Sequence, residues 1–336
     1  MKILVTGGAG YIGSHTVVEL AKAGYSPIIV DDLRCSQEIM LSGLKSILGK
    51  KIDHYAIDAA SQDLEKVFID HPDLGGAIHF AAYKAVGESV QQPIKYYENN
   101  ILATSNLLKL MLKYEVAHYV FSSSCTVYGQ PDILPVTETT ERKPAQSPYG
   151  RTKQICEDLV FDLMQGGAKL APVLLRYFNP IGAHESAAIG ELAIGVPNNL
   201  VPFVTQTAAG LREKLTVFGD DYNTPDGSCI RDYIHVTDLA RAHVAALEYL
   251  QKGGKIQVFN AGTGQGSSVL EILRTFERVN NIKLNYEIGP RRSGDIEKIW
   301  ANCDLIEKEL GWKAQLGLEE ALKSAWQWQQ TLNAQY

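Results

Sequence analysis

A glycine-rich turn near the start of the chain constrains its fold more than any other feature. The apolar run Lys2–Thr6 predicts a short strand, and a helical pattern follows over residues 12–23. Between the two, Gly7, Gly10 and Gly13 give the spacing G-x-x-G-x-x-G. Glycines at this spacing allow a tight turn, let a pyrophosphate approach the backbone, and bring the helix close to the strand. The turn therefore predicts a dinucleotide site whose phosphates lie at the helix N-terminus.

Strands and helices continue to alternate through the first half of the chain. Apolar, β-branched runs predict strands at residues 27–31, 54–57, 77–80, 118–122 and 172–177. Helical periodicity lies between them, at residues 93–112 and 148–164. Apolar strands separated by helices indicate a parallel sheet covered on both faces. We therefore expect an α/β fold with a Rossmann-type doubly wound parallel sheet, whose ligands bind at the carboxyl ends of the strands.

In the second half of the chain, strands and helices no longer alternate regularly. Residues 179–202 hold Gly, Pro, Asn and Ala without a clear period, which indicates an extended loop over a site. Helical patterns return at residues 201–211, 236–250, 268–279 and 318–332, and strands are predicted at 215–218, 256–260 and 283–288. We expect a dinucleotide-binding domain at 1–177 and a smaller C-terminal α/β substrate domain at 178–336, with some later segments returning to the first.

The composition argues against several other classes of protein. The 336 residues include 38 Asp plus Glu and 32 Lys plus Arg, so the net charge is -6, whereas a nucleic-acid binder carries a basic stripe. No apolar run reaches the roughly 18 residues of a membrane span. Because Met1 to Thr6 lead at once into the glycine turn, we do not expect this segment to be a signal peptide. Five dispersed cysteines without CxxC spacing and eight histidines without paired ligand spacing favour neither a disulfide framework nor a metal site. We expect a cytoplasmic enzyme that binds no metal, no nucleic acid and no membrane.

Acidic residues follow the second and third predicted strands. Asp31 lies where a carboxylate binds the adenosine ribose hydroxyls in dinucleotide folds. Because a carboxylate there repels a 2′-phosphate, NAD is favoured over NADP, although Arg34 nearby is a weak signal for the phosphate. Asp58 could meet the adenine amino group, and an ordinary turn acid explains it nearly as well.

A serine-rich strand end and a tyrosine–lysine pair supply the candidate catalytic groups. Three serines, the last of them Ser124, end the strand predicted at residues 118–122. Ser147 is a natural N-cap followed by proline, so Tyr149 and Lys153 share one face of the next helix. A phenol has a pKa of about 10, but a nearby ammonium, the helix N-terminus and an oxidised nicotinamide would stabilise the phenolate as a base. Ser124 could hydrogen-bond the reacting hydroxyl and share its proton.

The dinucleotide turn, the serine-rich strand end and the YxxxK pair together resemble the short-chain dehydrogenase/reductase family. Longer stretches narrow the resemblance to the UDP-glucose 4-epimerases of its extended branch. These stretches are GGAGYIGSH (7–15), AYKAVGES (82–89), SSSCTVYG (122–129), SPYGRTK (147–153), RYFNPIGAH (176–184), PNNLVPF (197–203), RDYIHVTDLA (231–240) and RRSGD (291–295). The resemblance runs essentially from end to end, and the C-terminal stretches make it far more specific than the glycine turn.

This resemblance implies tightly bound NAD as cofactor and a UDP-hexose as substrate. It assigns catalysis to Ser124, Tyr149 and Lys153. It assigns NAD binding to Gly7, Gly10, Tyr11, Ile12, Gly13, Asp31, Ser36, Asp58, Ala59, Phe80, Ala81, Lys84, Asn99, Lys153 and Tyr177. It assigns UDP-sugar binding to Lys84, Ser124, Tyr149, Phe178, Asn179, Asn199, Leu200, Thr216, Phe218, Arg231, Arg292, Asp295 and Ile299.

These assignments agree with the chemistry of the side chains. Arg231 and Arg292 offer the forked cations that suit a pyrophosphate in a net-acidic protein. Phe218 offers a flat partner for uracil, and Asp295 offers an acceptor for the nucleotide ribose.

The implied reaction is epimerisation at the sugar C4. Tyr149 takes the proton of the C4 hydroxyl while NAD accepts the hydride, and the planar 4-keto sugar, held through its UDP, turns over in the pocket. The hydride then returns to the opposite face, so that the cofactor is regenerated. The family also implies a homodimer, with the helices at 93–112 and 148–164 as candidates for the contact.

Related activities have to be separated from this one. Sugar-nucleotide 4,6-dehydratases carry an Asp-Glu pair just after the serine-rich strand end, where this chain has Cys125, Thr126 and Val127, so dehydration is not expected. A UDP-uronate 4-epimerase stays open, since only its pocket residues would differ, and so does another NAD-dependent sugar-nucleotide-modifying enzyme. A non-catalytic NAD-binding regulator tends to lose the tyrosine, which this chain keeps.

The range of sugars depends on Ile299. In the related family, the residue four places after the aspartate at 295 borders the sugar pocket. A tyrosine there limits the enzyme to glucose and galactose, whereas a small Cys or Ser admits N-acetylated sugars. Isoleucine is intermediate in size and stiff, because it is β-branched. Our hypothesis is that UDP-GlcNAc and UDP-GalNAc are accepted alongside UDP-Glc and UDP-Gal.

Overall fold

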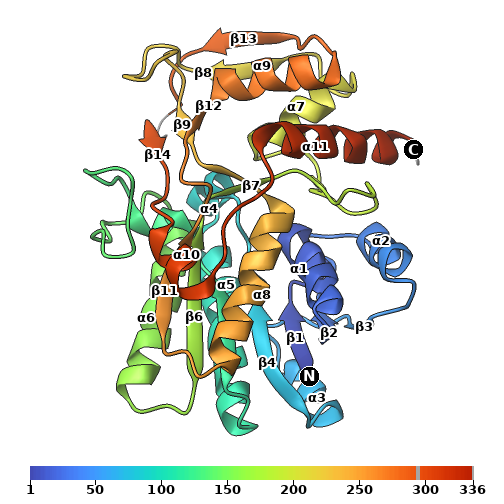
Figure 1. Cartoon of the computed structure of the whole chain (residues 1–336), viewed down its shortest axis with the longest axis vertical. Helices are drawn as coiled ribbons and strands as arrows, with labels where there is room; N and C mark the ends of the chain where they lie inside the picture. The colour runs from blue at the N-terminus through green and yellow to red at the C-terminus, as the bar shows by residue number, and fades with distance from the viewer. Residues whose placement is uncertain (293–295, 335–336) are drawn as a thin grey trace.

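A seven-stranded parallel sheet forms the centre of the lower part of the molecule in Figure 1. The computed structural model describes residues 1–292 and 296–334. The strand order is β11-β6-β5-β4-β1-β2-β3, and every neighbouring pair is parallel. The strands are β1 (Lys2–Thr6), β2 (Ser26–Val30), β3 (Asp53–Tyr55), β4 (Leu74–His79), β5 (His118–Ser122), β6 (Ala171–Tyr177) and β11 (Gln257–Ala261). The order reverses between β1 and β4, so the predicted doubly wound fold is confirmed.

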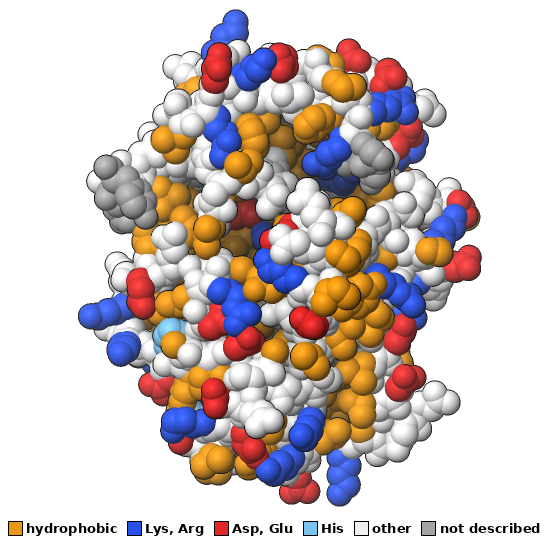
Figure 2. Space-filling model, turned by 180° about the vertical axis from the view of Figure 1, so that it is seen from behind, with side chains coloured by type: hydrophobic (Ala, Val, Ile, Leu, Met, Phe, Trp, Pro, Cys, Tyr) orange, Lys and Arg blue, Asp and Glu red, His pale blue; other side chains and the backbone are white. Residues whose placement is uncertain are grey.

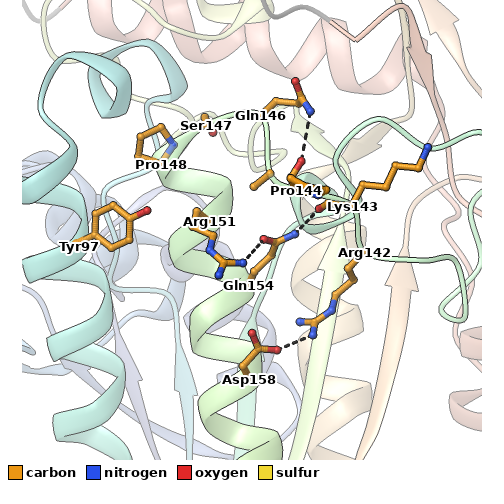
Figure 3. A pocket seen from close by; sticks show the side chains of 11 residues that line it. Tyr97, Arg142, Lys143, Pro144, Gln146, Ser147, Pro148, Arg151, Gln154 and Asp158 are labelled. Carbon is orange, nitrogen blue, oxygen red and sulfur yellow. Dashed lines mark hydrogen bonds and ion pairs between the residues drawn. The ribbon is translucent and has the colours of Figure 1, made fainter.

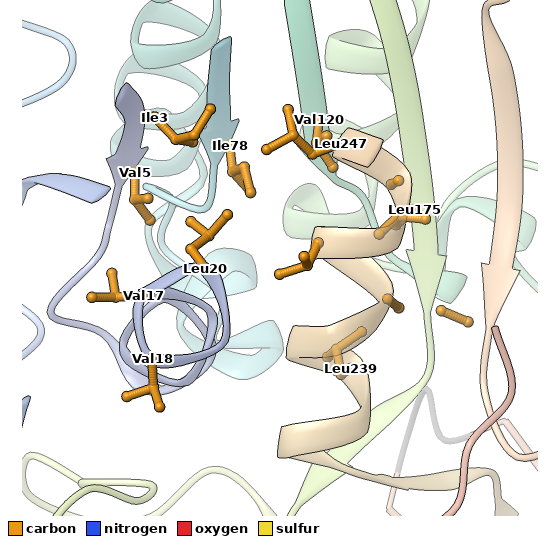
Figure 4. Packing of buried hydrophobic residues seen from close by; sticks show 14 of the residues in the cluster. Ile3, Val5, Val17, Val18, Leu20, Ile78, Val120, Leu175, Leu239 and Leu247 are labelled. Carbon is orange, nitrogen blue, oxygen red and sulfur yellow. The ribbon is translucent and has the colours of Figure 1, made fainter. Parts of the chain in front are cut away.

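Helices cover both faces of this sheet. Because successive side chains of a strand point to opposite faces, Ile3 and Val5 pack under one layer of helices and Leu4 under the other. The first layer holds α1 (Tyr11–Lys22), α2 (Glu38–Leu48), α8 (Val236–Gln251) and α10 (Asp304–Leu310). Figure 4 shows side chains of α1 and α8 against those of the strands. The second layer holds α3 (Glu65–Asp70), α5 (Pro93–Lys113) and α6 (Pro148–Gln165).

A smaller part with its own core lies beyond the carboxyl ends of the strands, at the top of Figure 1. It is built from α7 (Leu200–Ala208), α9 (Val269–Asn280), α11 (Leu318–Asn333) and the parallel pair β8 (Leu215–Phe218) and β13 (Tyr286–Gly289). Short strands connect it to the sheet, namely β7 (Asn179–Ile181), β9 (Ile230–Arg231), β10 (Tyr233–His235), β12 (Ser267–Ser268) and β14 (Lys298–Ile299).

The chain crosses between the two parts more than once. The strand β11 and the helix α8 follow residue 178 in sequence, yet they complete the sheet and its first helical layer. The division into domains at residue 177 stays a prediction. A helix α4 (Val86–Gln91) and two 3-10 turns, Gln62–Leu64 and Cys125–Tyr128, complete the described helices.

Two features are absent from the described residues. None of their helices is both long and apolar enough to span a bilayer. Nor do these residues bring three or more His, Cys, Asp or Glu side chains together in an arrangement that could hold a metal ion.

Candidate active site

The glycine turn between β1 and α1 forms a cradle that only glycine permits. Gly7 has φ +70°, and its N–H donates to the carbonyl oxygen of Val30 over 2.7 Å, which joins the ends of β1 and β2. A Cβ on Gly13 would lie 2.1 Å from the carbonyl oxygen of Gly7, so α1 can start this close to the turn only with glycine there. Gly10 provides no capping side chain, and the first turn of α1 holds no acidic residue. This helix end can therefore donate N–H groups to a pyrophosphate.

The predicted cofactor residues gather at the carboxyl ends of neighbouring strands. Asp31 follows β2, Asp58 and Ala59 follow β3, and Phe80 and Ala81 follow β4. The end of β4 lies against the glycine turn, since a Cβ on Gly7 would lie 2.8 Å from the nitrogen of Ala81. The others are Tyr11 and Ile12 in the first turn of α1, Asn99 on α5, and Tyr177 at the end of β6.

The Asp31 carboxylate is fixed by its surroundings. Its Oδ2 accepts from the N–H of Ala9 at 3.0 Å, and its Oδ1 accepts from the N–H of Leu33 at 2.9 Å and from Ser36 Oγ at 3.1 Å. Burial raises the pKa of Asp31, and these hydrogen bonds oppose the rise. The arrangement fits an acceptor for ribose hydroxyls at the end of β2.

Arg34 is engaged by carboxylates rather than left open to a 2′-phosphate. It forms ion pairs with Asp32 and, at 2.5 Å, with Asp58. Its Nη1 also donates to Asn99 Oδ1 at 3.5 Å. The guanidinium thus joins two predicted cofactor residues, and its compensated charge favours NAD over NADP.

Tyr149, Lys153 and Ser124 are brought together and buried, with 7%, 4% and 6% of their surface exposed. Ser147 Oγ accepts from the N–H of Gly150 at 3.1 Å, and this cap starts α6 so that Tyr149 lies in its first turn. Burial, the largest influence, raises the pKa of Tyr149 well above its ordinary value, and a hydrogen bond with Ser124 opposes the rise. A neutral phenol in this position needs a positive charge before it can act as a base.

The Lys153 ammonium is directed at the backbone of β5. Its Nζ donates to the carbonyl oxygen of Ser122 at 2.6 Å and lies 4.8 Å from the centre of the Phe121 ring. Burial lowers the pKa of Lys153 to about 8. The sequence predicted that Lys153 lowers the pKa of Tyr149, whereas burial, Tyr177 and Ser124 are the largest influences in the structure.

A buried ion pair behind these groups joins α6 to two strands. Glu157, one turn beyond Lys153, accepts from Ser123 Oγ at 2.6 Å and from Arg176 Nε and Nη2 at 2.9 and 2.6 Å. Glu157 is fully buried and Arg176 is 3% exposed. This network fixes the end of β5 relative to α6, and with it Ser124 relative to Lys153.

The sequence matches the NAD dependent epimerase/dehydratase family over residues 3–262. The chain belongs to this family. It is 47% identical to a UDP-glucose 4-epimerase of Haemophilus influenzae over 98% of this chain and 97% of that relative. The resemblance found in the sequence motifs is therefore confirmed.

Two solved structures are very similar to this epimerase/dehydratase family member. A UDP-glucose-4-epimerase from Stenotrophomonas maltophila, with bound NAD and formylated UDP-arabinopyranose, has a TM-score of 0.97 and 44% identity. A UDP-glucose 4-epimerase from Bifidobacterium longum, in complex with NAD+ and UDP, has a TM-score of 0.95 and 44% identity. Both alignments cover 100% of this chain and 100% of the other.

The predicted substrate residues of this family member are spread over the end of the sheet, the connecting strands and the smaller part. Phe178 and Asn179 follow β6, Asn199 and Leu200 start α7, Thr216 and Phe218 lie on β8, Arg231 on β9 and Ile299 on β14. Figure 2 shows a hollow between the upper and lower parts of the molecule, with basic side chains at its edge. Asp295 lies outside the described residues.

Two of these residues already contact each other, and two are neighbours across a strand pair. The guanidinium of Arg292 lies 5.5 Å from the centre of the Phe218 ring, which is 43% exposed at the end of β8. Arg231 and Ile299 are register partners of β9 and β14. Ile299 is 2% exposed and packs in one cluster with Phe178 and Cys125, next to Ser124 in sequence.

A pocket of about 590 Å³ lies on the other face of α6 and contains none of the predicted catalytic residues (Figure 3). Successive helix residues are about 100° apart, so Ser147, Arg151 and Gln154 lie opposite Tyr149 and Lys153. The pocket is lined by Tyr97, Arg142, Lys143, Pro144, Ala145, Gln146, Ser147, Pro148, Arg151, Gln154 and Asp158. Basic side chains of this pocket have partners nearby. Arg142, for example, forms an ion pair with Asp158 at 2.5 Å.

Sequence reasoning missed three residues that organise the site in this family member. Glu157 and Arg176 form the buried pair behind Ser123, and Glu191 accepts hydrogen bonds from the predicted ligand residues Lys84 and Asn199. The position of Glu157, four residues after Lys153 on the same helix, was a signal for a group near the catalytic lysine. No local pattern marks Glu191.

Proposed function

We propose that this chain is a UDP-glucose 4-epimerase, which interconverts UDP-glucose and UDP-galactose by transient oxidation at C4. The observation that carries the proposal is the buried group of Ser124, Tyr149 and Lys153 at the strand ends beside the glycine turn. NAD bound at that turn supplies a hydride acceptor that is regenerated in each cycle. The family match and the identity to a UDP-glucose 4-epimerase support the same activity.

Ser124 acts as a hydrogen-bond donor in this proposal. Its Oγ already accepts from the N–H of Thr126 at 3.2 Å and from the hydroxyl of Thr126 at 3.0 Å. With both acceptor positions used, its own proton is left for the phenol of Tyr149 or for the sugar C4 oxygen. Tyr149 then takes the proton from the C4 hydroxyl, and Ser124 steadies the oxygen as its charge develops.

The substrate side holds the UDP and leaves the sugar free to turn. Arg231 and Arg292 are proposed to bind the pyrophosphate, and Phe218 to stack on the uracil. A firm hold on UDP and few contacts to the sugar allow the 4-keto intermediate to present its other face. The predicted acceptor for the nucleotide ribose, Asp295, completes this proposal.

The closest rival activities require other residues in the active site. Dehydration needs carboxylates after Ser124, but Cys125 and Val127, 9% and 0% exposed, stand there and pack in an apolar cluster. UDP-uronate epimerisation would need its own pocket residues, and we treat it as an outcome of the assay below.

Incubation with UDP-galactose and no added cofactor tests the proposal. We expect UDP-glucose to appear until the two sugars reach equilibrium, with no net gain in reduced nicotinamide, because the hydride returns to the sugar. Sustained accumulation of NADH would indicate a dehydrogenase instead. Faster turnover of UDP-glucuronate in the same assay would favour the uronate epimerase.

We also propose that the enzyme accepts N-acetylated sugars. Ile299 is 2% exposed in the apolar cluster with Phe178, and we propose that it borders the sugar pocket, as the family resemblance implies. An isoleucine lacks the reach of an aromatic ring, so at this position it would crowd an acetamido group less than a tyrosine would. UDP-GlcNAc and UDP-GalNAc are therefore proposed as additional substrates.

A homodimer through α5 and α6 is proposed as the assembly. On α5, Ile94 and Leu102 are 66% and 52% exposed, so this helix presents large apolar side chains to the solvent. Figure 2 shows hydrophobic side chains gathered along the lower right of the back face. Burial of such a surface against a second copy would remove it from water.

A cytoplasmic location also stays a proposal, supported by five cysteines that are all free thiols.

A further inference from the structure

A carboxylate outside the predicted site residues lies between the cofactor side and the substrate side. Oε1 of Glu191 accepts from Lys84 Nζ at 2.9 Å and from Asn199 Nδ2 at 2.5 Å. The side chain of Glu191 is 12% exposed, whereas that of Lys84 is 53% exposed. Lys84 follows β4 of the sheet, and Asn199 is the N-cap of α7 in the smaller part. One oxygen atom thus links the two parts of the molecule.

The backbone that carries this carboxylate is fixed by α11. Trp328 Nε1 donates to the carbonyl oxygen of Glu191 at 2.9 Å. A Cβ on Gly190 would lie 2.4 Å from Trp328 Cγ, so the indole packs directly on the backbone before Glu191. A bridge between Ala183 and Gly190 closes the segment. The carboxylate therefore projects toward Lys84 and Asn199 from a backbone that Trp328 and the bridge hold in place.

The same cluster reaches the helix that receives the cofactor phosphates. Tyr11, the first residue of α1, donates from its hydroxyl to the carbonyl oxygen of Gly182 at 2.6 Å. Lys84 Nζ lies 5.8 Å from the centre of the Tyr11 ring. Desolvation lowers the pKa of Lys84, but the Glu191 carboxylate, together with Tyr177 and Cys35, raises it, and the net effect is a raised pKa. Lys84 therefore remains an ammonium at neutral pH.

An isolated carboxylate would be unfavourable in this place. NAD and a UDP-sugar both carry negatively charged pyrophosphates, which a nearby carboxylate repels. The positive charge of Lys84 compensates the negative charge of Glu191. The Glu191 carboxylate can therefore stay ionised here and accept its two hydrogen bonds.

We propose that Glu191 is a positioning residue for the UDP-sugar, which holds the Asn199 side chain against Lys84 and so closes the smaller part onto the cofactor side. The inference rests on the proposed function, since Asn199 is itself proposed to contact the substrate. Glu191 touches neither ligand in this scheme and acts through its two partners.

UDP binding to the NAD-loaded protein, measured by calorimetry, tests the role directly. In Glu191→Ala the shared acceptor is lost, so the Kd for UDP should rise about fivefold to tenfold. The KM for UDP-galactose should rise in parallel, while kcat changes less than about twofold, because the chemical step is remote. Glu191→Gln keeps an acceptor oxygen for both donors and should stay within about threefold of the wild-type Kd.

Controls separate positioning from a general loss of structure. Glu185→Ala removes an exposed carboxylate from the same segment and should leave the Kd unchanged. If Glu191 acts through Asn199, the double variant with Asn199→Ala should bind UDP no more weakly than Asn199→Ala alone. Should Glu191→Ala fail to fold, Glu191→Asp keeps the charge but falls one methylene short, and it should weaken UDP binding in the same way.

The outcomes distinguish this inference from the proposed function. A wild-type protein that binds UDP but does not convert UDP-galactose contradicts the proposed function, and the Glu191 variants can still be compared through their Kd. A wild-type Kd in Glu191→Ala, or additive losses in the double variant, overturns the positioning role alone. A wild-type protein that does not bind UDP overturns both.

Discussion

Among single residues, turnover depends most on the phenol of Tyr149. The substitution Tyr149→Phe removes the hydroxyl and keeps the ring, which is 7% exposed and packed in place. We expect the fold and the NAD content to persist while kcat falls at least about 100-fold, because the base is gone. Product separation and the absorbance of NAD released on denaturation measure the two quantities. Near-normal turnover in this variant would contradict the mechanism.

The pH dependence of a lysine variant tests how the phenol is activated. Below about pH 8 Lys153 carries a positive charge, since its pKa is about 8, and it loses that charge as the pH rises further. A cation favours the phenolate, so Lys153→Met should move the ionisation of Tyr149 to higher pH. We expect the kcat of the variant to be low at pH 7 and to rise toward pH 9.

The reference for this comparison is the pH profile of kcat for the wild type, measured on protein with the same NAD content. The defect of Lys153→Met should shrink as the pH rises, because hydroxide in solution then ionises the phenol that the lysine no longer assists. A defect of equal size at every pH would mean that Lys153 serves only to hold the end of β5.

The sugar range tests the place of Ile299. Ile299→Tyr should selectively suppress turnover of UDP-GalNAc, since overpacking at this buried position costs about 1–3 kcal/mol. Ile299→Ser should raise it. The measurement is the ratio of kcat/KM for UDP-GalNAc to that for UDP-galactose in the three proteins. The same ratio in all three proteins would contradict the proposal. So would a wild-type protein that does not convert UDP-GalNAc.

At the scale of elements, the cap of α6 connects helix stability to catalysis. Ser147 Oγ accepts from the N–H of Gly150, so Ser147→Ala should lower the free energy of unfolding by about 1 kcal/mol. The first turn of α6 also carries Tyr149, and loosening it should lower kcat. Denaturant unfolding and steady-state kinetics give the two values.

A second helix cap provides the control for this prediction. Ser268 caps α9 in a capping box with Glu271, and α9 carries none of the predicted catalytic residues. Ser268→Ala also removes the hydrogen bond that Ser268 Oγ donates to Asp226 Oδ2 at 2.5 Å, so it should cost at least as much free energy of unfolding. It should nevertheless leave kcat close to that of the wild type. Equal effects of the two substitutions on kcat would show that the cap of α6 has no special link to Tyr149.

The elements that the sequence missed are short or contain helix-breaking residues. The helix α2 contains Gly43, which lowers helix propensity. A Cβ at Gly43 would lie 2.0 Å from the carbonyl oxygen of Ala188, so this glycine serves the packing of α2 on a distant segment. Conversely, the strand β7 forms in the stretch predicted as a loop, because it pairs with β10 more than 50 residues later.

At the scale of the whole molecule, the proposed homodimer predicts a change of mass. Leu102→Glu places a charge on the outer face of α5 and should convert the dimer to a monomer in light scattering after size exclusion. Ile69→Glu changes a residue on α3 that is 63% exposed and should leave the mass unchanged. A wild-type protein that elutes as a monomer at micromolar concentration contradicts the assembly.

The sequence by itself determined the features that depend on neighbours along the chain. The turn at Gly7 requires a positive φ, the apolar runs from β1 to β6 follow the period of buried strands, and Ser147 caps the helix that places Tyr149 and Lys153 on one face. The end-to-end family motifs determined the reaction in the same way, since they are linear patterns.

Only the tertiary structure decided the contacts between distant segments. It placed Ile299 beside Arg231, turned the Lys153 ammonium toward the backbone of Ser122, and brought Glu191 between Lys84 and Asn199. Local propensities act over a few residues, whereas these pairings depend on how two cores pack on each other. A carboxylate such as Glu191 acquires its partners only when the smaller part closes over the ends of the strands.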